Sequence, residues 1–289
     1  MERDWGRDIA RRIYRAAVAP LLPAAIDETL HMWRSLGYVP NLWRPRSFNE
    51  KVAHRKLFSK DPRFVFLADK WNVRSYVRER IGEQYLVPVY YCTEDPSTLN
   101  VTDLPCSFVI KATHDSGSTI IVRNKHEVEW DKVTSYFAER LKKPFGVHTH
   151  EWFYQQIPPR VMVEALIRDA TYGDPIDYKF YVFHGIAHYI FVVQDRFGNP
   201  AARFYDSCWT PLDVTKGTRR LAPVMRKPKQ LEHMIRVAEA LARGFDFVRV
   251  DLYAPDDARV LFGEMTFTPA AGRDRFIPGS FDWELGKLW

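Results

Sequence analysis

Cysteine is scarce in this sequence. Its 289 residues include only Cys92, Cys106 and Cys208, which lie far apart and form no Cys-x-x-Cys pair. An odd number of cysteines at such spacing argues against a disulfide framework and against a zinc ribbon. Free thiols fit a reducing compartment, so we expect a cytoplasmic protein.

Long apolar runs are missing as well. No stretch of 18 consecutive apolar residues occurs, so the sequence predicts no transmembrane helix. Residues 1–8 are charged and lead into no apolar segment, which argues against a secretory signal. Hydrophobic residues still make up 46% of the chain, so it can build a core for one or two modest domains.

Familiar phosphate-binding motifs are also absent. The chain contains neither the Walker A pattern nor a Gly-x-Gly-x-x-Gly fingerprint. It also lacks an Asp-x-Asp sugar-nucleotide motif, which counts against a glycosyltransferase. The net charge of +6 favours an anionic partner. Because the basic residues are scattered rather than gathered in a stripe, we do not expect a nucleic-acid-binding module.

The first 60 residues read as a helical N-terminal extension. Residues 7–18 form a basic amphipathic pattern that ends before Pro20. Such a helix can make a weak peripheral contact with a membrane, or it can pack on the protein with its arginines in solvent. The packing alternative is favoured, because the apolar side lacks Trp, Phe and Leu. Ser47 and Glu50 form a capping box, which predicts a helix through Phe58.

The remainder alternates helical and strand-like segments, which predicts the α+β class. Two hairpins are expected, one around His184-Gly185 and one at the C-terminal end. The expected helices are 61–82, 127–142 and 231–242, and the expected strands are 85–91, 108–111, 119–122, 161–167, 177–183, 186–193, 247–253 and 260–267.

The last hairpin carries an unusual charge pattern. If Asp257-Ala258 is a two-residue turn, Asp251 faces Glu264 across the sheet and Arg249 faces Thr266. Two carboxylates placed opposite each other repel unless a cation lies between them, and oxygen ligands of this kind suit Mg²⁺. The alternative is a solvated strand surface whose charges happen to alternate. The neighbouring Arg249 favours a binding site, since a solvated surface does not need it.

A second candidate site begins at Lys111. An apolar strand delivers this lysine to its end, and a small polar loop with Gly117 follows. Backbone N–H groups in such a loop can cradle phosphate, with the lysine as a point charge. A surface lysine before an ordinary strand-to-strand turn would look the same.

These blocks resemble ATP-grasp ligases. Asp69-Lys70 with Arg74, the Lys111 strand and loop, Glu164, and the Arg249–Glu264 hairpin follow one another in the order of that superfamily. The closer similarity is to the TupA-like ATP-grasp proteins of bacterial polysaccharide clusters, and it runs from about residue 40 to the C-terminus. It is carried by residues 47–51, 67–70, 177–180, 203–206, 247–253 and 263–269.

The resemblance implies a fold, cofactors and site residues. The fold is ATP-grasp, with an extension (1–60), a first lobe carrying the phosphate loop (61–160) and a second lobe carrying the metal-binding hairpin (161–289). The ligands are ATP and Mg²⁺. The implied nucleotide contacts are Arg74 and Lys111 at the phosphates, His114, Ser116, Gly117 and Ser118 in the closing loop, Glu164, Ala165 and Leu166 at the adenine hinge, and Asp177 and Lys179 by the ribose and phosphates. Asp251 and Glu264 would bind the metal, and Arg249, with Lys111, would act in catalysis.

The activity implied is that of an ATP-dependent carboxylate–amine ligase working through an acyl phosphate. A uronic-acid-containing glycan or its precursor would be one substrate, and an amino acid or amine the other. The alternative is a glycosyltransferase of the same kind of surface-polysaccharide pathway. The sequence departs from many ATP-grasp enzymes at Thr266, where they have asparagine, and at Ala270-Ala271, where more glycine is expected.

Overall fold

The computed structural model describes residue 14 and residues 19–169, 171–194 and 200–289. Apart from Tyr14, the basic stretch 7–18 lies outside these residues, so its packing and membrane alternatives both remain predictions. Of the helices within the described part of the chain, none combines the length and the apolar composition that crossing a bilayer requires.

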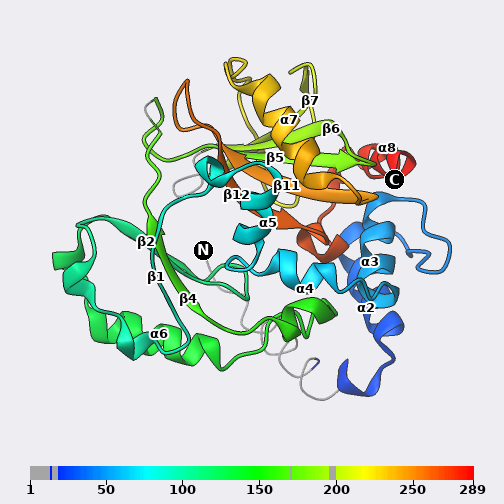
Figure 1. Ribbon diagram of the computed structural model, residues 1–289. Helices are drawn as coiled ribbons and strands as arrows, with labels where there is room; N and C mark the ends of the chain where they lie inside the picture. The colour runs from blue at the N-terminus through cyan, green and yellow to red at the C-terminus, as the bar shows by residue number, and fades with distance from the viewer. Residues whose placement is uncertain (1–13, 15–18, 170, 195–199) are drawn as a thin grey trace.

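A small antiparallel sheet builds one side of the molecule (Figure 1). Its strand order is β1-β4-β2-β3, and α6 covers it. Alternate side chains such as Phe108 and Ile110 point to the helix and bury themselves against Phe137. The elements are β1 (Val89–Thr93), β2 (Phe108–Ala112), β3 (Thr119–Val122), β4 (Val161–Ala165) and α6 (Trp130–Leu141).

A larger sheet builds the other side, with the path β10-β7-β6-β5-β11-β12 and with β8 paired to β7. Helix α7 lies across one face, where it buries Met234 and Leu241 against Val250. The opposite face carries Tyr181 and Phe204, which pack under α3 and α8. The elements are β5 (Asp177–Phe183), β6 (Ile186–Gln194), β7 (Ala201–Asp206), β8 (Pro211–Leu212), β10 (Arg220–Leu221), α7 (Leu231–Ala242), β11 (Phe247–Tyr253), β12 (Leu261–Thr266), α3 (Phe48–Phe58) and α8 (Ser280–Leu288).

Three further helices join these layers: α2 (Ala24–Leu36), α4 (Arg63–Ala68) and α5 (Val73–Arg80). In Figure 1, α4 and α5 lie between the two sheets, and α2 lies beside α3. The two sheets with their helices confirm the α+β prediction.

Local signals predicted several elements correctly. The Ser47 hydroxyl accepts the Glu50 amide at 3.2 Å, and the Glu50 carboxylate accepts the Ser47 amide at 3.1 Å, so the capping box begins α3 as expected. The His184-Gly185 turn has positive φ at both residues, 48° and 82°, which is the conformation a two-residue hairpin turn requires. Helix α7 has the predicted bounds.

The long helix predicted over 61–82 is wrong, because the chain forms α4 and α5 with a turn between them. The Asp69 carboxylate accepts the amide of Trp71 at 2.9 Å. Such a side-chain bond competes with the helical bond and favours a turn. The break is important for the site, since it presents Lys70 to the space between the sheets.

The predicted two-residue turn at Asp257-Ala258 is also wrong. Strand β11 ends at Tyr253 and β12 begins at Leu261, so the connection is longer. The register shifts by one residue after Asp251, at a bulge beside Gly263. The two departures compensate each other. Asp251 pairs with Glu264 and Arg249 with Thr266, as the alternation predicted.

Candidate active site

Side chains from both sheets line one cleft, with a cavity of about 160 Å³. The small sheet contributes Lys111 and the end of β4, and the large sheet contributes β5, β11 and β12. The charged residues on this lining are Lys70, Lys111, Glu164, Asp174, Asp177, Lys179, Asp251 and Glu264. The cleft therefore mixes cations with carboxylates, as a site for a metal–phosphate ligand does.

On the small-sheet wall, Lys111 pairs with Glu164. Their strands are antiparallel neighbours, and the Nζ–Oε1 distance is 2.5 Å. Both side chains are mostly buried, at 16% and 11% exposure, so the pair is held in place rather than swinging in solvent. Ala165 and Leu166 continue along the same wall. The hinge residues and the phosphate lysine expected from the sequence thus share one cavity.

Arg249 is not among the residues lining the cavity, but its guanidinium bridges the two opposed carboxylates of the large-sheet wall. Nε and Nη2 donate to the Asp251 oxygens at 2.6 and 2.8 Å, and Nη2 also donates to Glu264 Oε1 at 2.6 Å. Burial by itself would lower the pKa of Arg249, but the charges of Asp251 and Glu264 outweigh it and raise that pKa. The repulsion expected between the carboxylates is relieved here by arginine.

Lys179 completes this wall. It lies opposite Asp251 in the β5–β11 register, and its Nζ is 2.5 Å from Asp251 Oδ2 and 3.5 Å from Asp177 Oδ2. Asp251 is therefore contacted by two cations while being 2% exposed. The strand alternation brings Asp177, Lys179 and Asp251 to one face, next to the Lys111 wall.

The donor set fits a nucleotide-bound magnesium ion. Asp251 and Glu264 offer carboxylate oxygens from adjacent strands of one cleft. Among the described residues, no group of three or more His, Cys, Asp or Glu side chains could hold a metal without other ligands. Mg²⁺ typically takes one or two protein carboxylates and completes its shell with phosphate oxygens and water, so two acids suffice. Thr266 donates to Glu264 Oε1 at 3.2 Å, so it orients this carboxylate.

The phosphate-loop candidates follow Lys111 directly. His114 and Ser118 are buried, whereas Ser116 and Gly117 form an exposed tip with φ of 94° at the glycine. Asp115 anchors the loop, since its carboxylate accepts Ser118 Oγ and, at 2.5 Å, Arg140 Nε. None of these loop residues is among those lining the 160 Å³ cavity, although Lys111 and Thr119 on either side are.

Lys70 is a cleft residue that the sequence analysis did not assign. Its Nζ donates to the Asp115 carbonyl, so it ties the α4–α5 turn to the loop after β2. Burial lowers the pKa of Lys70, and the negative charge of Glu264 opposes that shift. The Asp69-Lys70 pair was part of the resemblance. Because one continuous helix was expected over these residues, the sequence did not indicate which basic residue faces the cleft.

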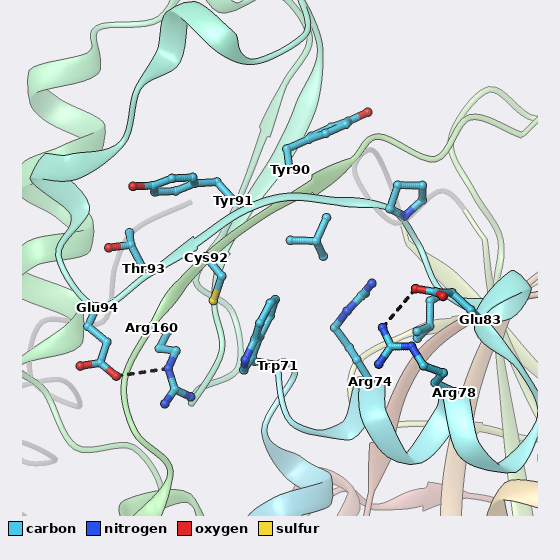
Figure 2. Close-up of a pocket in the computed structure, with 13 residues that line it drawn as sticks. Trp71, Arg74, Arg78, Glu83, Tyr90, Tyr91, Cys92, Thr93, Glu94 and Arg160 are labelled. Atoms are coloured by element: carbon cyan, nitrogen blue, oxygen red, sulfur yellow. Dashed lines mark hydrogen bonds and ion pairs between the residues drawn. The ribbon is translucent and has the colours of Figure 1, made fainter.

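Arg74, for which the resemblance implies a phosphate contact, lines a second groove of about 860 Å³ and is not among the residues lining the 160 Å³ cavity. Figure 2 shows its guanidinium beside Trp71, between α5 and β1. Nη1 donates to the Val87 carbonyl at 3.0 Å. Lys70 precedes α5 and Arg74 is the second residue of this helix, and the two basic side chains line different cavities.

Comparison with protein-family models gives a match that covers most of the chain. The model of the family described as TupA-like ATPgrasp matches residues 50–289. A search of curated proteins found no match.

Among solved structures, the fold is similar to a D-alanine–D-alanine ligase from Bacillus anthracis complexed with ATP, at 16% identity and a TM-score of 0.41, covering 70% of this chain and 55% of that one. An L-amino acid ligase from Bacillus licheniformis is similar at 14% identity and a TM-score of 0.42, covering 89% and 53%. The chain thus spans about half the length of these proteins.

Proposed function

The chain belongs to the TupA-like ATP-grasp family, and from this premise we propose that it is an ATP-dependent carboxylate–amine ligase. One observation supports this most directly. Lys70, Lys111 and Lys179 converge with Asp251 and Glu264 in one cleft between the two sheets. Transfer of a phosphoryl group requires cations around the phosphates and oxygen ligands for their metal, and this cleft supplies both.

The proposed reaction has two steps. A carboxylate oxygen of the first substrate attacks the γ-phosphorus of ATP, and the bond from this phosphorus to the β,γ-bridging oxygen breaks. The products of this step are ADP and an acyl phosphate. The amine nitrogen of the second substrate then attacks the acyl carbon. A C–N bond forms, the C–O bond to phosphate breaks, and inorganic phosphate and a proton are released.

Each wall has its own part in this proposal. Lys70 and Lys111 would neutralise the phosphates, while Glu164 and Ala165 at the end of β4, with Leu166 directly after it, would receive adenine. Lys179 lies between the phosphates and Asp251. Asp251 and Glu264 would hold Mg²⁺, which supplies positive charge to the phosphate oxygens when bound. Arg249, which donates to Asp251 and Glu264, would stabilise the developing charge of the acyl-transfer step, as a preorganised guanidinium can do.

The division into lobes is part of the same proposal, with the expected lobes 61–160 and 161–289 closing on ATP from either side. Strand β4 belongs with the first of them, because it pairs with β1 and β2. For substrates we propose a uronic-acid-containing glycan or precursor and an amino acid or amine, because the family analogy and the net charge of +6 both favour an acidic carbohydrate. We place the reaction in the cytoplasm because the three cysteines are free thiols.

The test is ADP release from Mg-ATP with a panel of uronic acids and amino acids, in the absence of any sugar nucleotide. The proposal requires ADP formation that depends on one acid and one amine together, with an amide in the product. If no ADP forms and transfer occurs only from a sugar nucleotide, the protein is a glycosyltransferase and the ligase proposal is wrong.

The affinity for Mg-ATP should show which of the two grooves binds the nucleotide. Changing Lys70 or Lys111 to methionine is expected to weaken Mg-ATP binding about 10- to 100-fold, because each change removes a charged contact to phosphate. Arg74→Met should leave this affinity within about twofold. Calorimetric titration of folded variants measures the difference. A loss in Arg74→Met as large as that in Lys111→Met would show that the nucleotide lies along α5 instead.

A further inference from the structure

A buried lysine lies beside the arginine of the cleft without a full set of partners. Lys216 belongs to β9 (Thr215–Lys216), which pairs with β13 (Phe276–Ile277). Its Nζ stands over the same sheet face as Arg249, 6.0 Å from the Tyr181 ring centre and 5.3 Å from that of Phe191. Lys216 is 4% exposed.

The ammonium of Lys216 makes only one polar contact in the described part of the chain. Asp274 Oδ2 is 3.6 Å away, which is an ion pair but too far for a hydrogen bond. The Arg219 guanidinium approaches the same oxygen at 3.9 Å. Two cations therefore share one carboxylate oxygen. A buried ammonium has three donors, and leaving them without acceptors is costly.

A second polar group at this place lacks a partner too. Tyr181 pairs with Arg249 across β5 and β11, so the two side chains are neighbours on one face. The Tyr181 hydroxyl is buried and has no hydrogen-bond partner among the described residues. Native proteins leave few buried polar atoms unsatisfied, and such atoms mark functional positions or a missing ligand. Tyr181 and Lys216 both offer donors and face the Arg249 side of the sheet.

The electrostatics at Lys216 favour an anion. Burial lowers the pKa of Lys216 to about 8; Asp274 opposes this shift, while Arg249 and Arg219 add to it. An anion bound beside the ammonium would compensate the excess positive charge. This cluster reaches the protein surface at Arg219 and Asp274, whose side chains are 38% and 33% exposed.

We propose that Lys216, Arg219 and the Tyr181 hydroxyl form a carboxylate-binding subsite next to Arg249, and that it holds the acid substrate of the ligase reaction. This inference rests on the proposed function. Arg249 marks where the acyl phosphate forms, and the subsite begins one strand away from it. The ligand that suits this subsite is an oxyanion that accepts two or three hydrogen bonds, as a carboxylate does.

Calorimetric titration can test this with the nucleotide cleft filled by Mg-ADP. The probes are acetate, glucuronate and galacturonate, each beside its neutral methyl ester. We expect at least one acid to bind while its ester does not. Lys216→Met should weaken that binding at least 10-fold and leave Mg-ADP affinity unchanged. Lys229→Met is the matched control, since this lysine pairs with Asp257 on the surface of the same lobe, and it should bind as the wild type does.

The melting temperature distinguishes a ligand-binding lysine from a merely structural one, because removing a structural lysine would lower it. Without ligand, Lys216→Met should melt at the same temperature as the wild type or higher, because it removes a desolvated charge. The inference is overturned if the variant melts lower and binds the acid normally, or if no acid binds the wild type while Mg-ADP does. Failure of the wild type to bind Mg-ADP would instead refute the ligase proposal itself.

Discussion

Changing Glu264 to glutamine is expected to reduce ATP turnover by a factor on the order of 10²–10³ while leaving the fold intact. The substitution keeps the shape of the side chain and removes one of the two carboxylates proposed to hold the metal. Arg249 would keep both of its hydrogen bonds to Asp251. Since Glu264 is 42% exposed, loss of its ion pair should change the free energy of unfolding by less than about 1 kcal/mol.

Two measurements decide whether Glu264 is a metal ligand or only a partner of Arg249. The first is a Mg²⁺ titration of ADP release, in which Glu264→Gln should require far more Mg²⁺ for its residual activity. The second is thermal unfolding in chelator, where the variant should match the wild type. Asp256→Asn is the control, because this partly exposed acid in the connection of the same hairpin pairs with the exposed Arg259. A strongly destabilised Glu264→Gln with unaltered Mg²⁺ dependence would show that the metal-site interpretation is wrong.

Replacing Glu28 by alanine is expected to destabilise the protein by about 3–5 kcal/mol. Glu28 Oε2 is 2.8 Å from Lys56 Nζ, and both side chains are 0% exposed. Arg273 donates to the same carboxylate at 2.6 and 3.0 Å. Removing Glu28 leaves the buried Lys56 and the partly buried Arg273 without this carboxylate. Breaking one partner of such a network costs far more than losing a surface pair.

This network also contacts a strained turn that follows β12. Lys56 donates to the Ala271 carbonyl at 2.7 Å, and Ala270 and Ala271 have φ of 50° and 53°, in the region that disfavours side chains. Urea unfolding measures the loss, with Asp61→Ala as control, since its partner Arg63 is 52% exposed and the pair should contribute less than about 1 kcal/mol. A Glu28→Ala variant as stable as that control would contradict the role given to the network.

The sequence by itself determined what depends on near neighbours. Alternation along 247–253 predicted that Arg249 and Asp251 share a face, and the paired strand predicted Glu264 opposite Asp251. The capping box predicted where α3 begins. Such features follow from backbone periodicity and local hydrogen bonds, so they can be seen before any long-range contact is known. The register even held although the turn was wrong, because the bulge beside Gly263 offset the longer connection.

Tertiary structure alone decided which charges meet. Lys70 and Arg74 are four residues apart, and only the break between α4 and α5 turns the lysine into the cleft and leaves the arginine in the second groove. Lys216 comes next to Arg249 because β9 folds back over the large sheet. Glu28 meets Arg273 across almost the whole sequence. The physical reason is that burial and ion pairing depend on distances between remote segments, and no local pattern encodes those distances.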